Sequence, residues 1–233
     1  MSPIGFKESL KKKAKEGFLP VVADFKCVSP GEGRLFEQEE APALAEKMVQ
    51  AGAPAISVVT EEKEFGGSLS LLEKITDRIS IPVLRKDFVK SKEDISVTKK
   101  CGAKAILLIC ACMEKETLRM LYDYSLEIGI EPFVETHNLE EMEFAKKLNV
   151  ELVGINNRDI LLLEKDGGTV NTTVGLADKR PKGAFLISES GILTPEDAER
   201  AVQHGADAIL VGTAIWKADN PFAFYRRMMT CIQ

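Results

Sequence analysis

The stretch "CGAKAILLI" (residues 101–109) joins a glycine to a run of aliphatic residues. The same pattern occurs in "AGAPAISVV" (51–59) and again in "HGADAILVG" (204–212). In each copy the glycine stands where a helix would end in a left-handed cap, and an apolar stretch typical of a buried strand follows within a few residues. The three copies therefore predict an internal repeat in which each helix is followed by a strand.

Short, apolar, β-rich runs occur eight times along the chain and predict eight strands. The runs are "LPVVADF" (19–25), "AISVVT" (55–60), "IPVLRKD" (81–87), "AILLIC" (105–110), "EPFVET" (131–136), "ELVGIN" (151–156), "AFLISES" (184–190) and "AILVGT" (208–213). The polar stretches between them are long enough for helices. One of these, "TPEDAERAVQHG" (194–205), opens with the Thr-Pro pair that is typical of a helix N-terminus.

Eight strands that alternate with helices favour a closed (β/α)8 TIM barrel over an open doubly wound sheet. No GxGxxG motif follows the first predicted strand, and no linker interrupts the alternation. We expect residues 1–233 to form a single barrel domain, with residues 1–18 as an N-terminal extension. Within it, "GFKESLKKKAKEG" (5–17) predicts a short extra helix, either a lid on the barrel bottom or a solvated face.

Composition excludes several classes of partner. The formal net charge of −5 and the sequence pI near 5.3 provide no basic field for nucleic acid. The longest apolar stretch, residues 105–113, is about half the length of a membrane span, and the basic start lacks the apolar core of a signal peptide. The five cysteines form no CxxC pair and suggest neither disulfides nor a metal site. We therefore expect a cytoplasmic protein without a membrane or nucleic-acid partner.

Polar and charged residues recur where the predicted strands end. In a βα barrel these carboxyl ends converge on one mouth, which is where such barrels hold their active sites. The strand-end residues are Asp24, Lys26, Thr60, Glu61, Lys86, Asp87, Cys110, Glu135, Asn156, Arg158, Glu189, Ser190, Gly212 and Thr213. Lysines and carboxylates at one mouth shift each other's pKa values and can supply an acid and a base. The pattern predicts a catalytic site.

The loops after the last two predicted strands indicate a phosphate site. "SESGI" (188–192) and "VGTA" (211–214) contain small residues that expose backbone N–H groups, at the place where such barrels often hold a phosphate. We expect Ser190, Gly191, Gly212 and Thr213 to bind it, with hydroxyl donors from the serine and the threonine.

These motifs, taken in order, resemble those of the indole-3-glycerol phosphate synthase family. The resemblance covers roughly residues 19–228, and the motifs "LRKDF" and "GINNRD" are its most specific elements. The quoted stretches are "VVADFKCVSPGEG" (21–33), "ISVVTEEKEFGGSLSLL" (56–72), "IPVLRKDFV" (81–89), "EPFVETHNLEEM" (131–142), "GINNRDI" (154–160), "SESGI" (188–192) and "ILVGTAIWKADNP" (209–221). The resemblance implies a cofactor-free reaction on a phosphorylated small molecule. In it, 1-(2-carboxyphenylamino)-1-deoxyribulose 5-phosphate closes a ring and loses CO2 and water.

The resemblance also implies roles for single residues. Lys86 matches the family's general acid, and Glu135 matches its general base. Lys26 matches the lysine that holds the anthranilate carboxylate. Asp24 stands where the family usually has a glutamate, so its carboxylate is one methylene shorter.

Further positions match the substrate-binding groups of the family. Asn156 and Arg158 of "GINNRD" match polar active-site positions, whereas Asn157 and Asp159 are expected to brace the loop. Ser190, Gly191, Gly212 and Thr213 match the phosphate cradle, and Ser29 matches a serine near the same phosphate.

Two alternatives to a synthase remain at this point. One is another phosphate-binding barrel enzyme, such as an isomerase of a phosphoribosyl compound, which has no evident use for Lys26 and Lys86 together. The other is a non-catalytic paralogue, which the aspartate at position 24 would permit. The segment before the first strand is shorter than the family's usual N-terminal extension. We expect a monomer without cofactor or metal.

Overall fold

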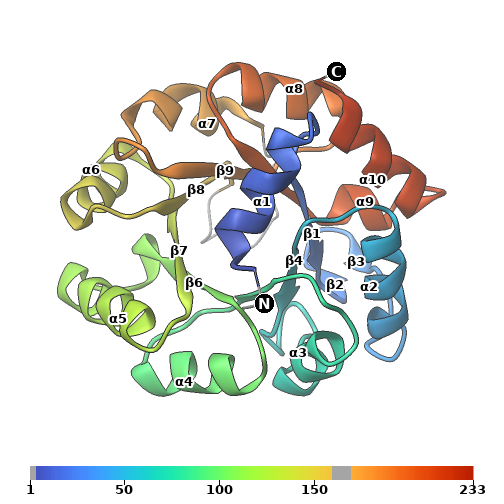
Figure 1. The fold of residues 1–233 in the computed structure, drawn as a ribbon, viewed down its shortest axis with the longest axis horizontal. Helices are drawn as coiled ribbons and strands as arrows, with labels where there is room; N and C mark the ends of the chain where they lie inside the picture. Colours follow the sequence, from blue (N-terminus) through green and yellow to red (C-terminus); the bar gives the residue numbers. More distant parts are fainter. Residues whose placement is uncertain (1–3, 159–168, 233) are drawn as a thin grey trace.

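The structure is a computed structural model that describes residues 4–158 and 169–232. Its parallel strands pair in chain order, and the first strand closes against the last to complete an eight-stranded barrel (Figure 1). The barrel strands are β1 (Val21–Phe25), β4 (Ile56–Val59), β5 (Val83–Lys86), β6 (Ala105–Ile109), β7 (Glu131–Thr136), β8 (Leu152–Asn156), β9 (Phe185–Glu189) and β10 (Ala208–Val211). The predicted TIM barrel is confirmed.

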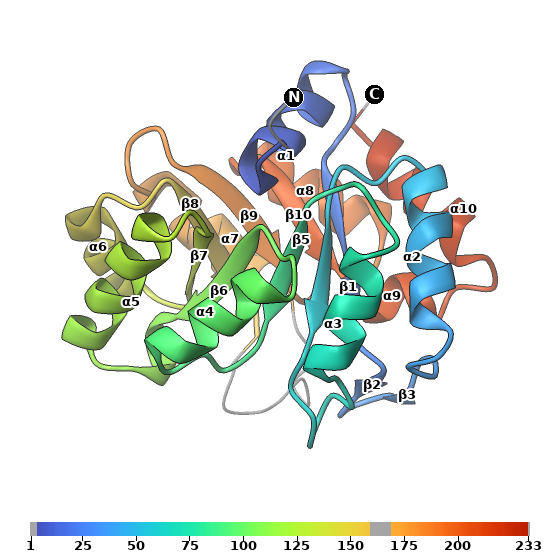
Figure 2. The same cartoon turned by 60° about the horizontal axis from the view of Figure 1, so that its bottom comes forward.

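Helices surround the barrel as an outer ring, one after almost every strand (Figures 1 and 2). The ring helices are α2 (Ala41–Gln50), α3 (Leu69–Thr76), α4 (Lys92–Lys100), α5 (Lys115–Glu127), α6 (Leu139–Leu148), α7 (Asn171–Leu176), α8 (Pro195–Gln203), α9 (Thr213–Trp216) and α10 (Pro221–Thr230). A further helix, α1 (Phe6–Lys15), precedes the first strand and lies outside this ring. Short 3-10 turns are η1 (Cys110–Cys112) and η3 (Ala177–Lys179), and β2 (Val28–Ser29) pairs with β3 (Gly33–Arg34) in a hairpin. None of the helices described is both long enough and apolar enough to cross a membrane.

Local signals explain where the helices begin and end. Ser91 and Thr194 each form a capping box at the start of a helix, at α4 and α8 respectively. The glycines of the three repeats, Gly52, Gly102 and Gly205, have φ angles of +100°, +82° and +107°. These angles lie in the left-handed region that favours glycine, so the repeat predicted from sequence marks real helix ends.

The N-terminal helix closes the bottom of the barrel. α1 lies across the barrel opening in Figure 1, and its Phe6 and Leu10 side chains are fully buried among residues of the barrel interior. Glu131, the first residue of β7, accepts the backbone N–H groups of Phe6 and Lys7, which have no partner within the helix. The carboxylate thus holds the helix N-terminus at the amino ends of the strands. Of the two expectations for this helix, the lid is confirmed.

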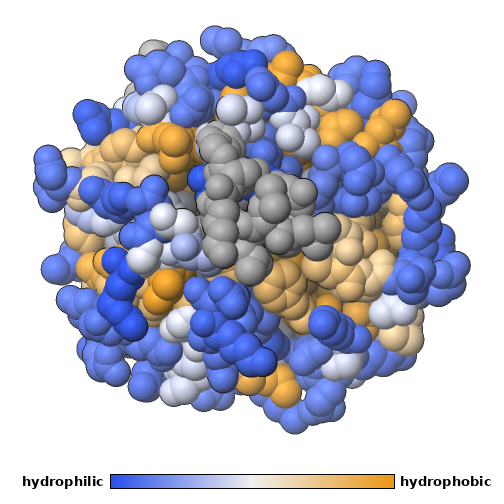
Figure 3. Space-filling view, turned by 180° about the vertical axis from the view of Figure 1, so that it is seen from behind, coloured by the Kyte–Doolittle hydropathy of each residue, from blue (hydrophilic) through white to orange (hydrophobic). Residues whose placement is uncertain are grey.

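The opposite end of the barrel, at the carboxyl ends of the strands, faces the reader in Figure 3. Around the edge of this face the residues are mostly hydrophilic, and apolar residues gather closer to the centre. α1 thus covers the amino ends of the strands and leaves the carboxyl ends, at this mouth, uncovered by that helix.

Replacing Phe6 by alanine tests the role of α1. A buried phenylalanine that is cut to alanine leaves a cavity, so we expect the free energy of unfolding to fall by about 3 kcal/mol or more. Urea unfolding measures this loss, and Lys12→Ala on the exposed side of the same helix is the control. Turnover at 25 °C should stay unchanged, because the mouth is at the other end. Equal unfolding midpoints for Phe6→Ala and the parent would contradict the assignment.

Candidate active site

The mouth of the barrel holds a lysine between two buried carboxylates. Lys86 is the last residue of β5, and its Nζ lies 3.1 Å from Oε2 of Glu135 and 2.9 Å from Oε2 of Glu189. Glu135 and Glu189 come from β7 and β9, and both side chains are completely buried. Because the strands are parallel, their carboxyl ends bring all three side chains into the same end of the barrel.

A glycine in β8 makes room for one of these carboxylates. A Cβ at Gly154 would lie 2.5 Å from Oε1 of Glu189 and 2.7 Å from Cζ of Phe133. No larger residue fits at this position without displacing both neighbours. The glycine in the middle of "LVGIN" is therefore explained by a contact with Glu189, which lies 35 positions further along the sequence (189 − 154).

Glu189 is a residue of the candidate site to which sequence analysis gave no role. Sequence analysis placed it among the strand-end residues, but gave its neighbour Ser190 the binding role. The available signal was alternation: Ile187 points into the barrel core, so Glu189, two residues further on the same strand, must also point inward.

The buried charges shift one another's pKa values. Burial alone would lower the pKa of Lys86, but the carboxylates of Glu135 and Glu189 outweigh burial and raise it above its ordinary value. Burial would raise the pKa of Glu135, yet Lys86 and His137 lower it. For Glu189, burial and the charge of Glu135 raise the pKa above that of an ordinary glutamate. The site thus holds a stable cation, a stable anion and a carboxyl group that retains its proton to higher pH.

The polar cluster that ends β8 divides between two tasks. Asn156 reaches the site, where its Nδ2 donates to Oε1 of Glu135 at 3.1 Å. Nδ2 of Asn157 instead donates to Oγ of Ser188 and to two backbone carbonyls at the end of β9. The expected bracing role of Asn157 is therefore confirmed. Asp159, for which the same role was expected, lies outside the described residues.

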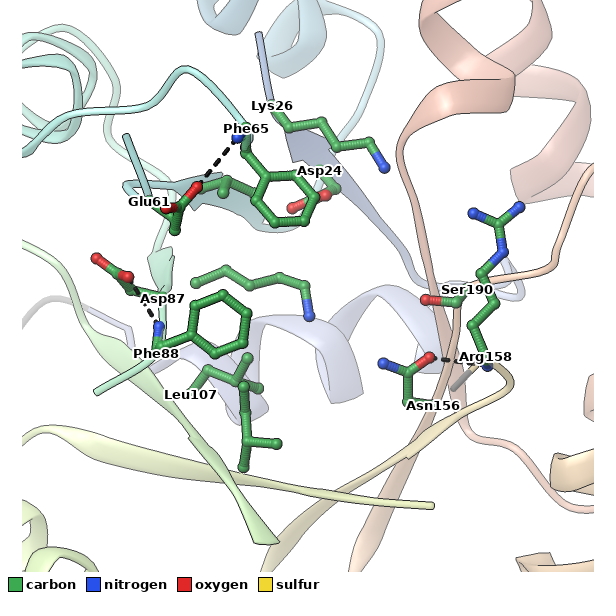
Figure 4. Close-up of a pocket in the computed structure, with 13 residues that line it drawn as sticks. Asp24, Lys26, Glu61, Phe65, Asp87, Phe88, Leu107, Asn156, Arg158 and Ser190 are labelled. Carbon is green, nitrogen blue, oxygen red and sulfur yellow. Dashed lines mark hydrogen bonds between the residues drawn. The ribbon is translucent and has the colours of Figure 1, made fainter. Parts of the chain in front are cut away.

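A pocket beside Lys86 has two chemically different walls (Figure 4). The apolar wall consists of Val59, Phe65, Phe88, Leu107 and Ile109. The polar residues lining the pocket include Asp24, Lys26, Asn156, Arg158 and Ser190. In Figure 4, Lys26 and Asp24 lie on one side of the pocket, and Asn156, Arg158 and Ser190 lie across from them. Such a pocket suits a ligand that combines a flat apolar ring with negative charges.

A second hollow adjoins this pocket, between the loops that follow β9 and β10. We refer to these as the two late loops. It shares with the pocket the residues Asp24, Lys26, Lys86, Arg158 and Ser190. Its remaining lining comes from the ends of β9 and β10 and the loops after them, at Gly191, Ile192, Leu193, Leu210, Val211, Gly212, Thr213 and Ala214. The structure therefore brings together all the predicted site residues except Ser29, which lies at the edge of this group: Oγ1 of Thr213 is 3.5 Å from its Oγ.

The backbone of these late loops is adapted to close contact. Ser190 and Gly191 both have φ of +65°, and a positive φ is uncommon for a serine. A Cβ at Gly212 would lie 3.2 Å from Oδ2 of Asp24 and 3.3 Å from Cε of Lys26. The missing side chain at Gly212 therefore lets the loop after β10 approach both charged residues closely.

Two further carboxylates that follow strands, those of Asp87 and Glu61, make contacts that stabilise loops. Asp87 accepts hydrogen bonds from Oγ1 of Thr60 at 2.5 Å and from Nη2 of Arg85 at 2.9 Å. Glu61 accepts backbone N–H groups of the loop that carries Phe65. Both carboxylates are thus engaged in positioning the walls of the pocket. Within residues 4–158 and 169–232, no group of three or more His, Cys, Asp and Glu side chains could hold a metal ion.

Comparison with known proteins agrees with this geometry. The family model of indole-3-glycerol phosphate synthase matches residues 1–228. The indole-3-glycerol phosphate synthase of Pyrococcus furiosus is 41% identical over 94% of this chain and 94% of its own, and that of Thermococcus kodakarensis is 39% identical over 97% of each. Among solved structures, the N-acetylmannosamine-6-phosphate 2-epimerase from Clostridium perfringens has a TM-score of 0.66 at 17% identity, covering 84% of this chain and 86% of that one. That last likeness concerns the fold alone.

The raised pKa of Glu189 predicts how stability changes with pH. The folded protein holds this proton more tightly than the unfolded chain, whose glutamate ionises near the ordinary value of 4.5. The stability that this group contributes therefore falls as the pH rises above 4.5, by about 1.4 kcal/mol per pH unit, until Glu189 ionises in the folded state. Glu189→Gln has no such proton, so its stability relative to the parent should improve over this range.

Urea unfolding at a series of pH values measures this difference. Glu116→Gln, on the exposed surface of α5, is the control and should follow the parent at every pH. Parallel stability curves for Glu189→Gln and the parent between pH 4.5 and pH 8 would show that Glu189 keeps an ordinary pKa.

Proposed function

The chain belongs to the indole-3-glycerol phosphate synthase family, and we propose that the residues at its barrel mouth perform that family's reaction. The substrate is 1-(2-carboxyphenylamino)-1-deoxyribulose 5-phosphate, which closes a ring and loses CO2 and water. The observation that carries the proposal is the position of Lys86 between Glu135 and Glu189, beside the hollow formed by the two late loops.

Lys86 is the general acid in this proposal. During ring closure the aromatic carbon attacks the ketone carbon, and negative charge develops on the ketone oxygen. The ammonium group of Lys86 stabilises that charge and donates a proton, which converts the oxygen into a hydroxyl group. The neighbouring carboxylates keep the lysine protonated before substrate binds.

Glu135 is the general base. After CO2 has left, Lys86 regains a proton from solvent and gives it to the hydroxyl group, which departs as water. Glu135 accepts the proton that is lost from the carbon next to nitrogen in the new ring. Because Lys86 and His137 keep its pKa low, Glu135 is ionised at neutral pH and ready to accept it.

The substrate is anionic at both ends, and the site supplies a partner for each. We assign Lys26 to the carboxylate of the anthranilate ring and the apolar wall of Phe65, Phe88 and Leu107 to the ring itself. The 5-phosphate would then occupy the second hollow. Its ligands would be Arg158, Ser29, Ser190, Gly191, Gly212 and Thr213.

Asp24 completes the charge arrangement. Its carboxylate contributes to the raised pKa of Lys86 and lies close to Gly212. We assign it the task of holding the two lysines in position. An isomerase of a phosphoribosyl compound would need no second lysine, so the presence of both Lys26 and Lys86 in one pocket favours the synthase.

The remaining properties follow from the same proposal. We expect residues 1–233 to act as one domain and as a monomer in the cytoplasm, without a cofactor, a nucleic acid or a membrane as partner.

Single substitutions test the acid and the base. Lys86→Met and Glu135→Gln should each lower turnover by about 10²-fold or more, with a much smaller change in KM, because neither replacement can transfer the proton. The assay follows the indole fluorescence that appears as the carboxyphenylamino substrate is consumed. Lys90→Met, an exposed lysine after the same strand, is the control. Near-normal turnover in either variant would remove that residue from the mechanism.

Gly212→Ala tests the anion site. The new methyl group would push against Asp24 and Lys26, so we expect KM to rise by about tenfold or more while the protein stays folded. Inorganic phosphate should inhibit the parent competitively and the variant more weakly. Unchanged KM together with unchanged phosphate inhibition would place the phosphate elsewhere.

A further inference from the structure

His137 transfers no proton in the mechanism above, yet it lies between the general base and another carboxylate. Its Nε2 is 3.1 Å from Oε1 of Glu135, and its Nδ1 is 3.1 Å from Oε2 of Glu141. The imidazole is mostly buried, with 13% of its side chain exposed, and Glu141 is buried to a similar degree. An aromatic ring that bridges two carboxylates at the edge of an active site calls for an explanation.

The geometry fixes the protonation state of this imidazole. Nδ1 faces a carboxylate oxygen within hydrogen-bond distance, so it carries a proton. Nε2 also lies 3.1 Å from a carboxylate oxygen, and the negative charges of both carboxylates favour a positively charged ring. Both nitrogens are therefore protonated. Since the Nε2–H is not aligned for a hydrogen bond, the attraction to Glu135 is mainly between opposite charges.

Glu141 is fixed firmly enough to hold the imidazolium in place. It is the third residue of α6, where the helix dipole favours a negative charge. Its Oε1 accepts from Nδ2 of the N-cap residue Asn138 at 2.8 Å, and its Oε2 also accepts the backbone N–H of His137 at 2.8 Å. The ring thus has a rigid anion behind it and the catalytic carboxylate in front.

The positive charge of His137 distinguishes the two glutamates that contact Lys86. Glu135 and Glu189 are both fully buried and both contact Lys86, so one ammonium group alone would not decide which of them keeps a proton. Of these two carboxylates, Glu135 is the one whose Oε1 lies 3.1 Å from Nε2 of His137. The other titratable groups nearby are the thiols of Cys110 and Cys112 after β6, and burial raises the pKa of both, which leaves them neutral.

We propose that His137, held by Glu141, is a positioning residue that makes Glu135, and not Glu189, the ionised carboxylate beside Lys86. The inference rests on the proposed role of Glu135 as general base and names the device that secures this role. Burial alone would lower the pKa of His137, but Glu135 and Glu141 raise it to about 10, in agreement with the geometry.

An NMR titration of the histidine rings tests the charge without any activity assay. The chain has only two histidines, and His204→Asn removes the second signal and so assigns the first. In the parent, His137 should remain protonated well above pH 8. Its midpoint should fall in Glu141→Gln and in Glu135→Gln, because each loses one of the two flanking charges. A ring that is neutral at pH 8, or whose midpoint is the same in Glu141→Gln, would overturn the proposal.

Kinetics test the consequence for catalysis. In His137→Asn, the proton held by Glu189 should move in part to Glu135. Each unit by which the pKa of Glu135 rises relative to that of Glu189 lowers the ratio of ionised to protonated Glu135 tenfold. Turnover should therefore fall by about tenfold or more. KM should change little, and the acid limb of kcat/KM should move to higher pH. Glu141→Gln should show the same change to a smaller extent. Glu140→Gln, next to it on α6 but exposed, is the matched control and should match the parent.

The outcomes separate the two proposals. A charged His137 whose loss leaves the acid limb unchanged would overturn the selection of Glu135 while leaving the synthase assignment intact. A parent protein without ring-closing activity would instead reject the proposed function, and the titration would still decide whether His137 is the charged partner of both carboxylates. If His137→Asn does not fold, the titration and Glu141→Gln still decide.

Discussion

A partly buried lysine held between two fully buried carboxylates in the barrel mouth imposes the constraint on which the rest of the site depends. A charge with little access to water must be paired; ionised Glu135 pairs with Lys86, and Glu189 gives its ammonium group a second partner at 2.9 Å. The neighbouring residues accommodate this group: Gly154 leaves space for one carboxylate, and Asn156 donates to the other. The same pairing shifts the pKa values apart, and this separation is what an acid and a base require.

The helix that stabilises the barrel and the residues proposed to carry out the reaction lie at opposite ends of the strands. At the amino ends of the strands, α1 fills the opening with buried apolar side chains and is fixed by Glu131. At the carboxyl ends, charged side chains and a serine with positive φ occupy positions that would be poor choices for packing alone. The closed bottom supplies stability that does not depend on the mouth, and the mouth residues can therefore serve catalysis.

Local patterns predicted much of this architecture. Apolar runs of strand length, amphipathic stretches and helix-ending glycines are short-range signals, and the structure confirms the barrel and the positive φ angles of Gly52, Gly102 and Gly205. The convergence of Lys26, Lys86 and Asn156 followed from the same patterns, because parallel strands must end at one face. The hairpin of β2 and β3 was not predicted, since strands of two residues have no periodicity to detect.

The sequence by itself determined the order of strands and helices, the end of the barrel that carries the chemistry, and the residue types available there. Only the tertiary structure decided which of these residues touch: Glu189 beside Lys86, and His137 between two carboxylates. The reason is physical. Periodicity is set by neighbours along the chain, whereas the pairing of buried charges is set by strand register and barrel closure, which join residues as far apart as 103 positions.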